Sequence, residues 1–218
     1  MEALRAILAL ERAELLVNLM FNFANRAVSV PDNPALSSTL DGLFGSELWR
    51  RLADLQGEER ERRFVELYTD QLKQRGAGYV LPFPMGYDES QRTLYYLVHA
   101  TKHHKGATLM KDVMVGVSSS NAWGYRGKAY YQSLPLFHLD AVVLPDVLLQ
   151  RFYGRAITFE NIIVETVEES SALRESDYRK ALQYLRSEGR VTVRSVDSKG
   201  RGLRGKDVVT FPAQPPQP

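Results

Sequence analysis

Apolar side chains recur at helical spacing in residues 58–76. Phe64, Tyr68 and Leu72 follow one another at four-residue steps, and Gly76 stands where a helix would end. Charged residues fill the positions between them. This segment therefore predicts an amphipathic helix with one buried face.

The same spacing predicts helices over residues 2–13 and 41–55. Between these two segments, the sequence PDNP at 31–34 places two prolines around two turn-forming residues. We therefore expect a loop over residues 25–39.

Three segments have the composition of β-strands. Residues 14–23 form an apolar run interrupted only by Asn18 and Asn22, which predicts a buried strand of the kind that parallel sheets contain. Residues 78–87 and 92–101 are separated by a short polar connector, which predicts an antiparallel hairpin.

Pro82 and Pro84 place the first strand of this hairpin at a sheet edge or at a bulge. Residues 102–114 then predict a helix, with Ala107, Met110 and Met114 on its inner face.

The C-terminal part predicts three helices, at 145–154, 158–170 and 176–188, followed by strands at 190–196 and 206–211 around a glycine-rich loop. In the third helix, four apolar residues fall at i, i+3, i+4 and i+7, and a glycine follows: Tyr178, Ala181, Leu182, Leu185 and Gly189. Three helices followed by a hairpin is the order of a winged helix-turn-helix.

We therefore expect an α/β portion at 1–115, a connector at 116–144, a winged helix-turn-helix at 145–212 and a disordered proline-rich tail at 213–218.

Positive charge is concentrated in the C-terminal unit. Residues 178–206 contain nine Lys or Arg and two Asp or Glu, a balance of +7 in a chain whose net charge is +2, which leaves −5 for the rest. Such asymmetry indicates a surface that meets a polyanion. On the third helix, Arg179, Gln183 and Arg186 lie within about 60° of one another, at 100° a residue.

Arg and Gln side chains on an exposed helix suit guanine and adenine edges in the major groove, and cations on a glycine-rich wing suit phosphates. No aromatic residues alternate with the cations, which favours binding to a duplex backbone over a single-strand stacking platform. We expect duplex DNA as the partner in preference to RNA. A solvated helix face or a protein-docking winged helix explains the same charges. The predicted nucleic-acid-binding residues are Arg179, Lys180, Gln183, Arg186, Arg190, Arg194, Lys199, Arg201, Arg204 and Lys206.

The sequence contains no motif of a known catalytic or metal site. It has no cysteine, and His99 and His103 fall on either side of the predicted strand-to-helix junction, unlike a metal-binding pair on one helix. We expect no metal site and no catalytic constellation.

Polar residues after the predicted strands define a candidate ligand cleft, formed by Asn22, Asn25, Arg26, Lys102 and His103. Buried asparagines bonded to neighbouring backbone, and an exposed basic turn, are the alternative interpretations. The apolar runs are too short to cross a bilayer and the charged N-terminus is unlike a secretory signal, so we expect a cytoplasmic protein without membrane contact.

Several stretches together resemble the three-Cys-motif partner proteins, TcmP: ELLVNLMFNFANR, LFGSELWRRL, YTDQLKQRGAGYVLPFPM, TLYYLVHATKHHKGATLMKDVM and SDYRKALQYLRSEGRV. The resemblance implies a class I methyltransferase-like, Rossmann-type sheet followed by a winged helix of the GMT-like type. It also implies a partner that resembles radical-SAM enzymes and contains three cysteines.

The earlier strands of the family's sheet, with an Asp-Pro-Phe-Gly-like motif, have no counterpart before residue 2. We therefore expect a truncated sheet that holds no cofactor by itself, with S-adenosylmethionine bound only if the missing half is supplied. A DNA-binding protein of the TcmP type is the leading hypothesis. A methyltransferase-like enzyme acting on nucleic acid with a partner is the rival. An open sheet edge predicts a homodimer or a partner chain.

Overall fold

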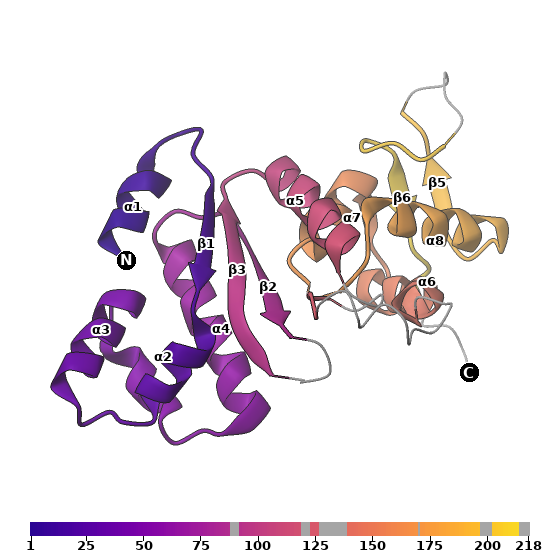
Figure 1. Ribbon diagram of the computed structural model, residues 1–218. Helices are drawn as coiled ribbons and strands as arrows, with labels where there is room; N and C mark the ends of the chain where they lie inside the picture. The colour runs from indigo at the N-terminus through magenta and orange to yellow at the C-terminus, as the bar shows by residue number, and fades with distance from the viewer. Residues whose placement is uncertain (88–91, 119–122, 127–138, 170, 197–201, 214–218) are drawn as a thin grey trace.

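A computed structural model describes residues 1–87, 92–118, 123–126, 139–169, 171–196 and 202–213. Two parts follow one another along the chain (Figure 1). The first contains a three-stranded sheet with helices on both faces, and the second contains three helices and a small sheet.

The first sheet consists of β1 (Leu15–Leu19), β2 (Tyr79–Gly86) and β3 (Thr93–Thr101) in the order β1-β3-β2. Both pairs are antiparallel, so the predicted hairpin and the edge position of β2 are confirmed. The register shifts between Met85 and Gly86, at the end of β2.

The strand predicted over 14–23 is wrong in two respects. It ends at Leu19, and α2 (Phe21–Val28) begins two residues later. It also pairs antiparallel, and the side chain of Leu16 is 58% exposed, so β1 is no doubly buried parallel strand. Periodicity in a short apolar run does not separate a strand from the first turn of a helix.

The loop predicted over 25–39 is also too long. α3 (Pro34–Phe44) begins within it, because the Asn33 side chain accepts hydrogen bonds from the amides of Ala35 and Leu36 at 3.1 and 3.2 Å. Pro34 occupies the first helical position, where its missing N–H costs nothing.

The single helix predicted over 41–55 is two elements. Gly45 ends α3 in the left-handed conformation with φ of 65°, and the 3-10 helix η1 (Glu47–Leu52) follows. The other predicted helices of this part are present as α1 (Glu2–Ala9) and α4 (Gly57–Gln74).

Helices α1 to α4 lie on one face of the sheet (Figure 1) and enclose the larger core. Phe44, Phe64 and Tyr68 pack edge to face at its centre, and Trp49 is fully buried. The Trp49 indole donates a hydrogen bond of 2.7 Å to Asp41, so its buried N–H is satisfied.

Helix α5 (His104–Val117) covers part of the opposite face (Figure 1), with Ala107 and Met114 packed against Leu81 and Phe83. The helix predicted at 102–114 and its inner face are therefore confirmed.

The second part contains α6 (Leu139–Phe152), β4 (Ala156–Thr158), α7 (Phe159–Thr166), α8 (Glu175–Ser187), β5 (Thr192–Arg194) and β6 (Val208–Thr210). Its sheet has the order β4-β6-β5, and α6, α7 and α8 share one core with it. This is the arrangement of a winged helix.

The sequence did not predict β4, which has three residues, and α6 starts before the proline at which the first helix was expected. The domain bounds at 115 and 145 stay a prediction, and residues 214–218 of the tail lie outside the described part.

Candidate nucleic-acid interface

Helix α8 is fixed in the winged-helix core by its apolar stripe. Tyr178, Leu182 and Leu185 are buried, and the Asp177 carboxylate accepts a hydrogen bond of 2.9 Å from the backbone N–H of Arg174 at the start of the helix. The acidic first turn also suits the positive end of the helix dipole. The polar side of α8 is thereby held outward.

The outward side of α8 presents Lys180, Gln183, Tyr184 and Arg186, all exposed. Within the described part of the chain, no ion pair or hydrogen bond engages the side chains of Lys180, Gln183 or Arg186. These three groups are available to a ligand without breaking a contact of the protein.

Two of the predicted contact residues are held within the protein. The Arg179 guanidinium forms an ion pair with Glu175 one turn earlier and lies 4.5 Å from the centre of the Phe159 ring. Arg190 pairs with Asp146 of α6 at 3.2 Å. A ligand would have to compete with these contacts, so both residues are less accessible than the sequence predicted.

The wing carries further cations. Arg194 on β5, Arg204 and Lys206 are exposed, whereas Lys199 and Arg201 lie outside the described residues. Arg194 lies opposite Val208 of β6, and Arg204 and Lys206 lie in the segment that leads into β6, so all three belong to the hairpin that follows α8.

Asp207 shapes the base of the wing, and sequence reasoning missed it. Its carboxylate accepts hydrogen bonds from the backbone N–H groups of Val196 at 3.1 Å and Arg204 at 2.8 Å, on opposite sides of the loop. Burial alone would raise the pKa of Asp207, but these hydrogen bonds outweigh burial and lower it. The signal in the sequence was a single acid at the end of a basic run.

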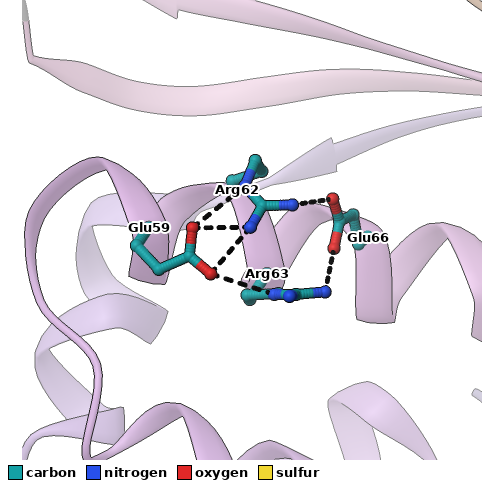
Figure 2. A network of polar contacts seen from close by, with 4 residues as sticks. All are labelled: Glu59, Arg62, Arg63 and Glu66. Atoms are coloured by element: carbon teal, nitrogen blue, oxygen red, sulfur yellow. Dashed lines mark hydrogen bonds and ion pairs between the residues drawn. The ribbon is translucent and has the colours of Figure 1, made fainter.

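The outer face of α4 is a useful contrast because its cations are neutralised within the helix. Figure 2 shows Arg62 and Arg63 between the carboxylates of Glu59 and Glu66, with ion-pair distances from 2.6 to 3.1 Å. Hydrogen bonds from Arg62 and Arg63 lower the pKa of Glu59. The basic residues of α4 thus form no free cationic surface.

The candidate ligand cleft is not one site. Asn22 and Asn25 lie on α2 and line a cleft of about 780 Å³ beside the N-terminal end of α4. Lys102 and His103 follow the far end of β3, because Leu19 pairs with Tyr96 while Leu15 pairs with Ala100. The five residue steps from Tyr96 to the last residue of β3 correspond to roughly 17 Å, so the two halves of the predicted cleft lie near opposite ends of this strand segment.

Each part of that predicted cleft has local partners. The Lys102 ammonium donates to the carbonyl of Leu10 at 2.8 Å, and the exposed Arg26 donates to the carbonyl of Asn22 at 3.3 Å. His103 is the N-cap residue of α5. In the described residues, the Asn25 amide oxygen is buried without a hydrogen-bond partner.

The described residues contain no group of three His, Cys, Asp or Glu side chains arranged to hold a metal ion. None of their helices combines the length and the apolar character needed to cross a bilayer.

No curated protein and no solved structure shows a significant match to this chain. A match to a family does exist in the second part. Residues 128–198, which include α6 to β5, match the GMT-like wHTH domain family, and this match agrees with the winged-helix order of helices and strands.

Proposed function

We propose that this protein binds duplex DNA through α8 and the wing of its winged helix. The observation that carries the proposal is the outward side of α8, where Lys180, Gln183 and Arg186 are exposed and have no protein partner in the described part of the chain. The hairpin that follows α8 in the chain carries further exposed cations, Arg194 and Lys206, which supports the same conclusion.

The chemistry of the side chains suits some of them to base edges and others to phosphates. Gln183 and Arg186 suit adenine and guanine edges when α8 enters the major groove. Lys180, Arg194 and Lys206 suit phosphates, which set affinity and salt dependence without reading sequence.

We also propose that the protein is of the TcmP type, with a methyltransferase-like first part that does not bind S-adenosylmethionine alone. The match to a GMT-like winged helix supports this, because the resemblance implies such a domain at the C-terminal end. The antiparallel hairpin beside β1 is compatible with the edge of a methyltransferase sheet, although three antiparallel strands are not a Rossmann-type sheet. Calorimetry with S-adenosylmethionine tests this part: binding by the chain alone would contradict it.

A protein-docking winged helix is the second candidate. Tyr184 on α8 is 52% exposed and Val196 beside the wing is 61% exposed, and exposed apolar side chains favour protein contacts. A methyltransferase-like enzyme completed by a partner chain remains the rival of a different class.

Fluorescence anisotropy with a labelled duplex, repeated at several salt concentrations, separates these candidates. Lys180→Ala should weaken binding and reduce the salt slope by about one unit, because it removes a phosphate contact. Arg186→Ala should weaken binding mainly by removing a base-edge contact, and should relax the preference for guanine. Arg62→Ala is the matched control, because this arginine is already paired on α4. Absent binding at low salt, or equal effects of all three substitutions, would exclude the proposed interface.

A further inference from the structure

The two edges of the first sheet differ in how their backbone groups are satisfied. At the outer edge of β2, the N–H of Val80 donates to the Glu168 carboxylate at 2.7 Å. Pro82 has no N–H, and its carbonyl accepts a hydrogen bond of 2.8 Å from the Trp123 indole. These groups protect the first half of this edge from further strand pairing.

The second half of the β2 edge is closed by the residue Tyr125. Its N–H donates to the carbonyl of Pro84 at 3.0 Å, and its carbonyl accepts from the N–H of Gly86 at 2.9 Å. Every outward residue of β2 from Val80 to Gly86 is therefore either proline or bonded.

The β1 edge has no such protection. In the described part of the chain, Leu15–Leu19 makes no backbone hydrogen bond outside its ladder with β3. The strand sequence LLVNL contains no proline and no charge, and its pairing with β3 is regular. Natural proteins cover or block an edge of this kind, because its free N–H and C=O groups recruit another strand.

Apolar side chains extend from this edge across the adjoining face of the sheet. A groove of about 290 Å³ lies between the sheet and α5, and aliphatic, aromatic and methionine side chains line it. Its lining includes Leu16 of β1 and Val113 and Val117 of α5, which are 58, 54 and 49% exposed. An apolar surface next to an open strand edge is the composition of an unfilled strand-pairing interface.

We propose that β1 of a second copy of this chain covers the edge, pairing antiparallel across a twofold axis at Val17. The two three-stranded sheets then become one six-stranded sheet, and the two grooves adjoin. A twofold interface must be self-complementary, and the uncharged strand LLVNL can meet a second copy of itself without placing like charges together. In this register Leu16 lies opposite Asn18, and Glu14 lies opposite Met20, so no like charges meet across the interface.

Sedimentation velocity of the full chain over a range of concentrations tests the proposal. We expect a reversible dimer with a dissociation constant of about 1–100 µM, typical of a small interface. Leu16→Lys and Val113→Glu should each weaken it by about tenfold or more. Leu109→Glu is the matched control, since Leu109 is 68% exposed on the same helix but lies outside the groove.

Circular dichroism shows whether each variant is folded. A folded wild-type chain that stays monomeric at about 100 µM would overturn the proposal. A dimer that survives both groove substitutions would overturn it as well, because its interface would lie elsewhere. If the chain stays monomeric by itself and forms a complex only when another protein binds at Leu16, the edge belongs to that protein and not to a second copy.

The register can be tested separately because the chain has no cysteine. Leu16→Cys and Asn18→Cys place the two thiols directly opposite each other only when the two variants are mixed. We expect a disulfide-linked heterodimer from the mixture and little homodimer from either variant alone. Equal cross-linking in all three samples would contradict the twofold register.

Discussion

The ammonium group of Lys111 on α5 lies 3.0 Å from the carbonyl oxygen of Glu169, beyond the C-terminal end of α7. It also donates to the carbonyl of Thr166 at 3.3 Å, and the residue is 4% exposed. A buried cation thus binds the carbonyl end of a helix in the other half of the chain, where the helix dipole favours positive charge. Lys111 therefore couples the first sheet to the winged helix.

Burial lowers the pKa of Lys111 to about 8, from an ordinary value of 10.5. Below pH 8 the ammonium is charged in both the folded and the unfolded protein, so folding carries the full cost of burying it. Between pH 8 and 10.5 the folded protein loses this proton first, and the free energy of unfolding should rise with pH.

We expect an increase of about 1–3 kcal/mol between pH 7.5 and 9.5, since each pKa unit corresponds to about 1.4 kcal/mol. Urea unfolding at several pH values measures it, with Lys111→Met as the variant that lacks the titrating group. The variant should show a flatter profile. Parallel profiles for the two proteins would show that another group is responsible.

Glu168 forms the second connection between the two halves. Its carboxylate accepts from the N–H of Val80 at 2.7 Å and from the Lys73 ammonium at 2.9 Å. Glu168→Ala leaves the strand N–H without a partner and should lower the free energy of unfolding by about 1–3 kcal/mol. Glu168→Gln keeps an acceptor and loses mainly a partly exposed ion pair, so it should cost about 1 kcal/mol or less. Equal losses measured in urea would mean that the Val80 hydrogen bond contributes little.

Substitutions at two neighbouring cations of α8, Arg179 and Lys180, should rank in opposite order in their effects on stability and on DNA affinity. Arg179→Ala removes an ion pair with Glu175 and a contact with the Phe159 ring, and should lower the free energy of unfolding by about 1 kcal/mol. Lys180→Ala removes a solvated side chain, with an expected change within about 0.5 kcal/mol. In duplex binding we expect the opposite order. Thermal melting and anisotropy on the same two samples provide the comparison, and a larger affinity loss for Arg179→Ala would reverse our assignment.

The elements that the sequence predicted correctly are those specified by local patterns. Helix α4 follows the four-residue spacing from Phe64 to Leu72, and the β2–β3 hairpin follows from two strand-like segments with a short connector. Pro82 and Pro84 correctly placed β2 at an edge. Helix α2 was missed because its apolar residues continue directly from the strand before it.

The contacts that join the two halves were beyond local patterns. Lys111 and Glu169 are 58 positions apart, and Glu168 and Val80 are 88 apart, so no short-range spacing indicates them. The pairing of Arg179 with Glu175 was different, because acids and cations four residues apart on a helix regularly pair. The sequence therefore indicated this ion pair, and the pair lowers the positive charge that α8 can offer to a ligand.

Two glycines in the first half differ in the space beside them, and alanine substitution should have opposite effects. A Cβ at Gly78, just before β2, would lie 2.9 Å from the backbone carbonyl oxygen of Lys102, and this backbone is held next to the last residue of β3. Gly78→Ala therefore forces a main-chain shift and should lower the free energy of unfolding by about 1–3 kcal/mol. A Cβ at Gly42 within α3 meets no atom within 4 Å, so Gly42→Ala should raise it by about 0.5–1 kcal/mol through helix propensity alone. Urea unfolding of the two variants beside the wild type measures both changes. A stable Gly78→Ala protein would show that β2 and the end of β3 separate more easily than their close backbone approach implies.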